Sequence, residues 1–168
     1  MTHQTKTDDA CSELKQLHRN GAAGLLEPAE LQVIVADDDE ILRSVVCTPL
    51  REWGFTLTEA EDGAHALRAA LTSDKPLLIV LDWVMPEMSG LEVCRQVRAA
   101  GKLAYILLLT SRSGTENIAE GLRAGVDDYL VKRMSREELC VRLNLAMRVL
   151  SLQWQLRKRC AELQPASR

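Results

Sequence analysis

The sequence predicts an α/β fold, a doubly wound parallel sheet of five strands with helices on both faces. Three observations support this class. Short apolar runs typical of buried strands recur along the chain, and segments with apolar residues at helical spacing lie between them. Several of these runs also end in an acidic residue, a hydroxyl residue or a lysine. In open α/β sheets, the functional residues lie at the carboxyl ends of the strands.

The expected strands and helices alternate along the chain from residue 31. Strands are expected at residues 31–36, 55–60, 77–81, 105–109 and 128–131. Apolar stripes at helical spacing lie over residues 41–50, 64–71, 91–97, 118–122 and from 139 onward. Pro49 should kink or shorten the last turn of the first of these helices. Ser135 and Glu138 form the pattern of a capping box, which predicts the start of the last helix.

The composition is that of a folded globular protein. Hydrophobic residues make up 46% and charged residues 27% of the 168 residues, which fits one domain with an appendage. The formal net charge of -3 gives no electrostatic reason to expect nucleic acid or an anionic membrane as a partner. No apolar run approaches the ~20 residues of a membrane helix, and the N-terminus lacks the apolar core of a signal peptide. The cysteines have no CxxC spacing, which argues against a disulfide framework or a zinc site, so we expect a reduced, cytoplasmic protein.

The sequence pattern divides the chain into three parts. Residues 1–31 are a polar, partly flexible leader with a short helix around 11–19, and residues 32–150 form the main domain. Residues 151–168 continue the last helix to about residue 163 and end in a short tail. A second apolar stripe follows a-and-d spacing along this helix, interrupted by Arg159, and comprises Leu145, Val149, Leu152, Leu156 and Leu163. This stripe predicts a homodimer through the C-terminal helix, and the alternative is an exposed helix that frays.

The candidate site lies at the carboxyl ends of the expected strands. Asp82 ends the apolar run LLIVLD; the neighbouring strand ends carry Asp37 and Asp38, Thr110, and Lys132. Since crossovers between parallel strands are right-handed, these ends lie along one edge of the sheet and the side chains converge. Three neighbouring carboxylates repel one another unless a hard cation lies between them, and magnesium is the natural candidate. Asp82 can then attack phosphorus to form an acyl phosphate, with Thr110 donating a hydrogen bond to it and Lys132 balancing its charge.

These residues lie within sequence motifs that resemble those of the receiver domain of two-component response regulators. The motifs are VIVADDDEILR, EAEDGAHAL, LLIVLDWVMPEMSGLEVCRQVR, ILLLTSR and GLRAGVDDYLVK, followed by an amphipathic helix. The resemblance covers about residues 32–150 and implies the flavodoxin-like strand order 2-1-3-4-5. It also implies a regulatory phosphoacceptor rather than an enzyme, one that catalyses only its own phosphorylation and slow dephosphorylation. The implied phosphodonor is a histidine kinase, a phosphotransfer protein or a small acyl phosphate.

The resemblance assigns a role to each residue of the acidic cluster. Asp82 would be the phosphoacceptor and a magnesium ligand. Asp38 would bind magnesium directly, Asp37 would bind it through water, and the backbone carbonyl of Val84 would complete the protein ligands. Lys132 would be the ammonium that binds the phosphoryl group.

The resemblance also implies how the signal is read. Thr110 would be the switch hydroxyl, and Tyr129 the aromatic ring that turns inward on activation. The conformational change would appear at the face formed by the fourth helix, the fifth strand and the last helix. The overrun of the last helix resembles the signalling helix that joins receivers to output domains such as diguanylate cyclases. No direct binding of nucleic acid or of a membrane is expected from this chain.

The chain departs from the family pattern at Arg133, where the family usually has a proline joined by a cis bond. A cis bond before a non-proline residue costs ~2.5 to 4 kcal/mol, against ~0.5 to 1 kcal/mol before proline. The sequence leaves the isomer of the Lys132–Arg133 bond open, and a trans bond would reshape the loop before the last helix and could move the lysine. Val84 and Arg112 lie two residues after the phosphoacceptor and the switch hydroxyl, where the family tunes the access of water. Because an apolar Val84 cannot orient an attacking water, we predict a long-lived acyl phosphate.

Two other functions stay open at this point. One is a pseudo-receiver, an adaptor that keeps the fold and binds a partner without phosphorylation, and Arg133 is its support. The other is a phosphatase of the haloacid dehalogenase type, which also uses an aspartate nucleophile and magnesium and whose Asp-x-Asp word matches residues 37–39. In that family the lysine precedes a second acidic pair, whereas Asp127 and Asp128 come before Lys132 here. A cap domain is also missing from the pattern.

Overall fold

Five parallel strands form one sheet in the protein, a computed structural model that describes residues 12, 16, 26–111 and 115–164. The strands are β1 (Gln32–Ala36), β2 (Leu57–Ala60), β3 (Leu77–Asp82), β4 (Ala104–Thr110) and β5 (Asp128–Val131). The helices are α2 (Glu40–Glu52), α3 (Gly63–Thr72), α4 (Gly90–Ala99), α5 (Thr115–Ala124) and α6 (Arg136–Leu163), and the short 3-10 helix η1 (Pro28–Glu30) precedes β1.

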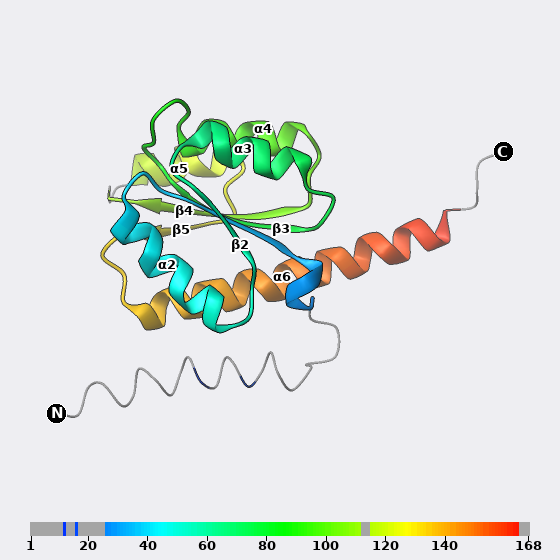
Figure 1. Cartoon of the computed structure of the whole chain (residues 1–168). Coiled ribbons are helices and arrows are strands. Elements are labelled where there is room, and N and C mark those ends of the chain that lie inside the picture. Colours follow the sequence, from blue (N-terminus) through cyan, green and yellow to red (C-terminus); the bar gives the residue numbers. More distant parts are fainter. Residues whose placement is uncertain (1–11, 13–15, 17–25, 112–114, 165–168) are drawn as a thin grey trace.

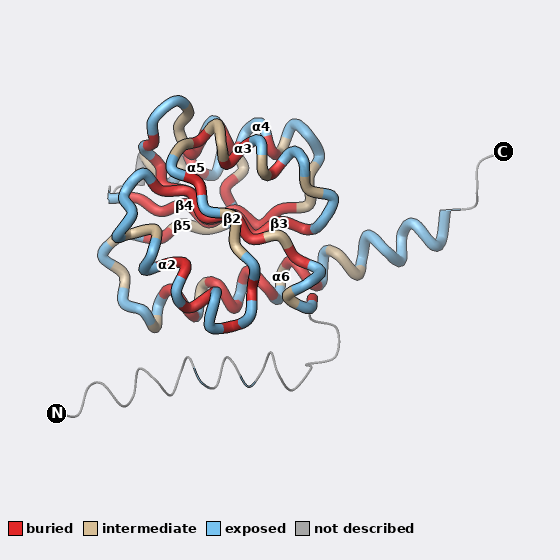
Figure 2. Tube along the Cα trace, in the orientation of Figure 1, coloured by how far each residue is buried: buried red, intermediate tan, exposed pale blue. Residues whose placement is uncertain are grey.

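The strand order confirms the predicted fold class. The sheet runs β2-β1-β3-β4-β5, and every neighbouring pair is parallel. Helices α2 and α6 cover one face of the sheet, and α3, α4 and α5 cover the other (Figure 1). Each face has its own apolar cluster of buried side chains. Every residue of β3 and β4 is buried (Figure 2), which explains why these two strands appear in the sequence as unbroken apolar runs.

Helix ends follow the capping signals in the sequence. The Asp39 carboxylate accepts hydrogen bonds from two backbone N–H groups in the first turn of α2. The Ser135 hydroxyl accepts one from the N–H of Glu138, which is the forward half of the predicted capping box. Helix α2 continues through the buried Pro49 and ends at Glu52. The second strand starts at Leu57, two residues later than predicted, and before it the N–H of residue 55 donates to a carbonyl at the end of α2.

Helix α6 continues far beyond the sheet, as predicted. It ends at Leu163, and the part beyond the domain is exposed (Figure 2). Of the second apolar stripe, Val149 packs against the core cluster of α2 and α6. The other members are exposed: Leu145, Leu152, Leu156 and Leu163. The predicted seam therefore lies on the outer face of the helix.

The end of the leader packs against the domain. Leu26 and Leu31 are each only 4% exposed and belong to the core cluster of α2 and α6. The predicted short helix around 11–19 lies outside the described residues, apart from positions 12 and 16. Across residues 26–111 and 115–164, no helix combines the length and the apolar character that crossing a membrane requires.

Candidate functional site

The predicted site residues lie together at the carboxyl edge of the sheet. Asp37 directly follows β1, Asp82 is the last residue of β3, and Lys132 directly follows β5. The strands are in register at this edge, since Ala36 pairs with Leu81. The convergence expected from the right-handed crossovers is therefore observed.

The centre of the site is a lysine bound between two carboxylates. The Lys132 Nζ lies 3.0 Å from Asp37 Oδ2 and 2.9 Å from Asp82 Oδ2. Asp37 is fully buried and Asp82 is 5% exposed. Asp38 is exposed, and one oxygen from each of the three carboxylates lies within 4.8 Å of the others. Three negative charges and one positive charge thus share a small volume that opens to solvent at Asp38.

Backbone groups fix the two buried carboxylates. Asp37 Oδ1 accepts a hydrogen bond of 2.9 Å from the N–H of Asp39, and the Asp37 carbonyl accepts one of 2.7 Å from Arg43. Asp82 Oδ1 accepts a long hydrogen bond, 3.4 Å, from the N–H of Val84. Asp37 Oδ2 receives no well-directed hydrogen bond within the described residues, and its contact is the ion pair with Lys132.

A glycine lets the turn after β3 close tightly behind Asp82. A Cβ atom on Gly90 would lie 2.2 Å from the carbonyl oxygen of Asp82, which is far closer than any real contact. The N–H of Gly90 donates to the carbonyl of Trp83 over 3.0 Å. Neither Gly90 nor Arg43 was among the predicted site residues. The word MSG signals the glycine, whereas nothing local marks the arginine.

Burial and the charged neighbours move two pKa values upward. Burial raises the pKa of the Asp82 carboxyl, and the Asp37 carboxylate adds to this, while Lys132 opposes it without cancelling it. For Lys132, burial lowers the pKa, but the two carboxylates together outweigh burial and the net direction is upward. The site therefore favours a charged lysine and disfavours a charged Asp82.

The remaining predicted residues lie around this centre. Thr110 is buried at the end of β4, and its carbonyl accepts a hydrogen bond of 2.9 Å from the N–H of Lys132. Val84 is 61% exposed beside the acidic cluster. Tyr129 is half-buried and lines a separate hollow of about 140 Å³ between α5 and β5 with Ile118 and Leu122. Arg112 lies outside the described residues.

The departure from the family pattern at Arg133 does not displace the lysine. No peptide bond in the described chain is cis, so the Lys132–Arg133 bond, whose isomer the sequence left open, is trans. With this trans bond the Lys132 Nζ contacts both buried carboxylates, so the lysine lies in the acidic cluster.

Comparison with known proteins decides the family. The family model of the response regulator receiver domain matches residues 33–144. The chain belongs to this family. Receiver domains are the regulatory partners in two-component signalling, and this receiver has the family's five-stranded sheet. Membership favours a receiver over the phosphatase that the Asp-x-Asp word left open.

The sequence relatives of this receiver are longer regulators. It is 42% identical over 118 residues to the response regulator MprA of Mycobacterium ulcerans, covering 70% of this chain and 50% of that protein. Identity to MprA of Mycobacterium tuberculosis strain H37Ra is 41%, covering 70% and 51% of the two chains. The chain thus spans about half the length of the curated relatives that it matches.

Several solved structures of response regulators and receiver domains resemble this receiver. The Francisella response regulator 1452 receiver domain is 36% identical, with a TM-score of 0.64 over 70% of this chain and 96% of that one. Vibrio cholerae CheY4 is 30% identical, with a TM-score of 0.64 over 69% and 98%. The DrrB receiver domain, in a form activated by BeF3, is 27% identical, with a TM-score of 0.63 over 70% and 97%.

Proposed function

We propose that this receiver takes a phosphoryl group onto Asp82 from the phosphohistidine of a histidine kinase or of a phosphotransfer protein. The observation that carries the proposal is the bridging contact of Lys132, whose Nζ lies 2.9 Å from Asp82 and 3.0 Å from Asp37. When a phosphoryl group adds negative charge at Asp82, the Lys132 ammonium can pair with that charge and still remain in the site. It would then bind a phosphoryl oxygen with the same ammonium.

Magnesium is the cation that the acidic cluster fits. The cluster offers only oxygen ligands, and one oxygen of Asp37 lacks a directed hydrogen bond within the described residues. Asp38, Asp82 and the backbone carbonyl of Val84 would hold the ion directly, and Asp37 would hold it through water. When bound, the ion neutralises charge that gathers on the carboxylates and on the phosphoryl oxygens.

The protein's own residues position the transfer. A carboxylate oxygen of Asp82 forms the new P–O bond while the P–N bond to the donor imidazole breaks, and the bonding electrons leave with that nitrogen. Thr110 donates a hydrogen bond to a phosphoryl oxygen, and Lys132 pairs with another. The backbone bonds that fix Asp37 and Asp82 hold the acceptor in place during this step.

Phosphorylation would be read at the face of α5, β5 and α6. Thr110 ends β4 beside this face, and Tyr129 lies on β5 within it. The face already carries exposed apolar side chains: Leu122, Val131, Val141 and Leu145. We propose that Thr110 and Tyr129 change position together and that the exposed seam of α6 then joins a second copy.

Labelling with acetyl phosphate and magnesium tests the phosphoacceptor. We expect a covalent, acid-labile adduct in intact-mass spectra of the wild type and none in Asp82→Asn. Asp74→Asn, which changes an exposed aspartate outside the cluster, should label like the wild type. Absence of label in the wild type would favour the adaptor, and turnover of a free phosphate ester would favour the phosphatase.

The lifetime of the adduct tests the role of the residue beside Asp82. The exposed, apolar Val84 cannot orient a water toward phosphorus, so we expect the acyl phosphate to be long-lived. Val84→Gln should shorten its lifetime, because an amide can hold such a water. Loss of label from the wild type within seconds would contradict this expectation.

Light scattering tests self-association through α6. Leu152 and Leu156 are 67% and 63% exposed, so Leu152→Asp and Leu156→Asp should disrupt a dimer without unfolding the domain. Leu71→Asp, at a 41% exposed position of α3, is the control. Point variants are preferable to truncation after Val149, since truncation would also remove the buried Leu150 and Ser151. Equal monomeric masses for all proteins, with and without phosphorylation, would remove the dimer.

A further inference from the structure

The segment before β1 lies against α6 where that helix leaves the domain. Leu26 and Leu31 fill the core cluster of α2 and α6, and the short helix η1 lies between them. In Figure 1 the blue turn of η1 lies beside α6 at the end of the sheet from which the helix emerges. This end is opposite to the phosphorylation site, about 22 Å along α6 from its start at Arg136 to Ser151.

One buried hydrogen bond joins the segment to the helix. The N–H of Leu26 donates to Ser151 Oγ over 2.8 Å, and the two residues are 125 positions apart. Ser151 is 1% exposed, and its hydroxyl donates in turn to the Met147 carbonyl over 2.7 Å. Ser151 thus satisfies a buried backbone N–H that would otherwise lack a partner, which makes a polar residue at this core position useful.

Two further bonds hold the segment and the first residue of β1 to the chain that precedes β3. The Lys75 Nζ donates to the carbonyl of Ala29 over 2.8 Å, and the N–H of Gln32 donates to the carbonyl of Pro76 over 3.0 Å. Both partners lie immediately before β3. The segment therefore connects α6 to the residues that precede β3.

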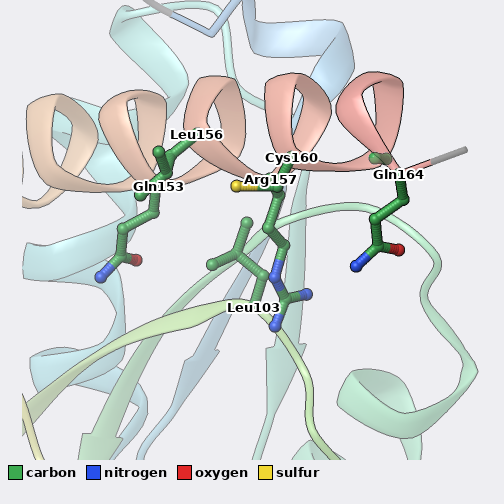
Figure 3. A pocket seen from close by; sticks show the side chains of 7 residues that line it. Leu103, Gln153, Leu156, Arg157, Cys160 and Gln164 are labelled. Carbon is green, nitrogen blue, oxygen red and sulfur yellow. The ribbon is translucent and has the colours of Figure 1, made fainter.

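Three residues of the α6 overrun contact the domain or the segment before β1. Ser151 meets the segment, Trp154 packs against the same core cluster, and Arg157 donates to the carbonyl of Gly101 over 3.3 Å. These three residues are three positions apart, so they share a face of the helix. Leu103 and Arg157 line an open groove of about 510 Å³. Figure 3 shows both side chains below α6. Of the exposed seam, Leu156 also lines this groove (Figure 3), whereas Leu145, Leu152 and Leu163 do not.

We propose that residues 26–31 are a strap that fixes the direction in which α6 leaves the receiver. Because the strap binds α6 at its point of exit, it determines where the outward-facing seam lies relative to the domain. Residues 26–31 and the part of α6 at the exit from the domain would then move together. The strap acts whether or not Asp82 is phosphorylated, so it does not depend on the proposed phosphotransfer.

Hydrogen exchange of the full chain tests the strap. All proteins carry Leu156→Asp, so that self-association does not protect α6. Ser151→Ala removes the acceptor and Leu26→Ala removes the apolar anchor. We expect each to speed exchange of the α6 amides after residue 151 by about tenfold, with β3 and β4 unchanged. Leu152→Ala, at the neighbouring exposed position, is the matched control and should leave all rates unchanged.

Two outcomes would overturn the strap. Unchanged exchange after residue 151 in both variants would show that the segment does not hold α6 at its exit from the domain. Equal acceleration in α6, β3 and β4 would show that the segment only adds to global stability. If Ser151→Ala does not fold, Leu26→Ala gives the same comparison, because it leaves the polar network of the helix intact.

Discussion

Replacing Asp82 by asparagine should stabilise the metal-free receiver even though it abolishes phosphorylation. The substitution keeps the shape of the side chain and the oxygen that accepts from the N–H of Val84. It removes one of two buried negative charges that share the single ammonium of Lys132. The expected gain depends on whether the attraction to that ammonium exceeds the repulsion and the cost of burial.

The distances in the site allow an order-of-magnitude answer. With an effective dielectric constant of about 20, the Asp82–Lys132 pair at 2.9 Å contributes about 6 kcal/mol. Repulsion from Asp37, whose oxygen lies within 4.8 Å, costs about 3.5 kcal/mol. Asp38 is exposed, so water screens its repulsion to about 1 kcal/mol. Coulomb forces thus favour the charge by only about 1 kcal/mol, whereas removing a carboxylate from water costs several kcal/mol. Desolvation prevails, in agreement with the raised pKa of Asp82.

We expect Asp82→Asn to raise the free energy of unfolding by about 1 to 3 kcal/mol in EDTA at neutral pH. A carboxyl whose pKa is raised by folding destabilises the fold above that pKa, so the wild type should gain stability as the pH falls toward ~4. The difference between the two proteins should therefore shrink on acidification. Saturating magnesium should favour the wild type, by about 2.7 kcal/mol at one hundred times its dissociation constant.

Urea unfolding followed by circular dichroism measures these differences. Asp74→Asn serves as the exposed control and should change the unfolding free energy little. Equal or lower stability of Asp82→Asn in EDTA would refute the reasoning, because it would mean that the ion pair with Lys132 outweighs burial.

Three further predictions concern Lys132, two glycines and two cysteines. Lys132→Ala should lower the unfolding free energy by about 3 to 5 kcal/mol, since it leaves the buried carboxylates without a counterion. It should also abolish labelling by acetyl phosphate, and labelling at the wild-type rate would contradict the role of Lys132. Gly90→Ala should destabilise by about 3 kcal/mol or more, because its Cβ would overlap a carbonyl oxygen. Gly121→Ala, with no neighbour closer than 4.0 Å in a helix interior, should instead stabilise by about 0.5 to 1 kcal/mol; similar losses in both variants would exclude a steric cause. The native protein should react with a thiol reagent at exposed Cys160 and not at buried Cys47, whose pKa burial raises to about 11; rapid modification of Cys47 before unfolding would show that its burial is transient.

Much of the fold and of the site can be predicted from local patterns. Unbroken apolar runs mark β3 and β4, because strands buried on both faces need apolar residues at every position. Polar residues at the ends of these runs locate the site, because parallel strands bring their carboxyl ends to one edge. The length of α6 follows from helical periodicity that continues to Leu163. Errors in the fold lie at element boundaries, such as the late start of β2, before which the N–H of residue 55 donates to a carbonyl of α2.

The sequence by itself determined which strands end in acidic, hydroxyl or lysine residues. It also determined which of these residues could meet at the carboxyl edge of the sheet. Only the tertiary structure decided that Lys132 reaches both buried carboxylates across a trans bond to Arg133. It alone also placed Leu26 on Ser151, where α6 leaves the domain. The physical reason is range: periodicity and capping act over a few residues, whereas these contacts join segments that meet only when two helices and a sheet have packed.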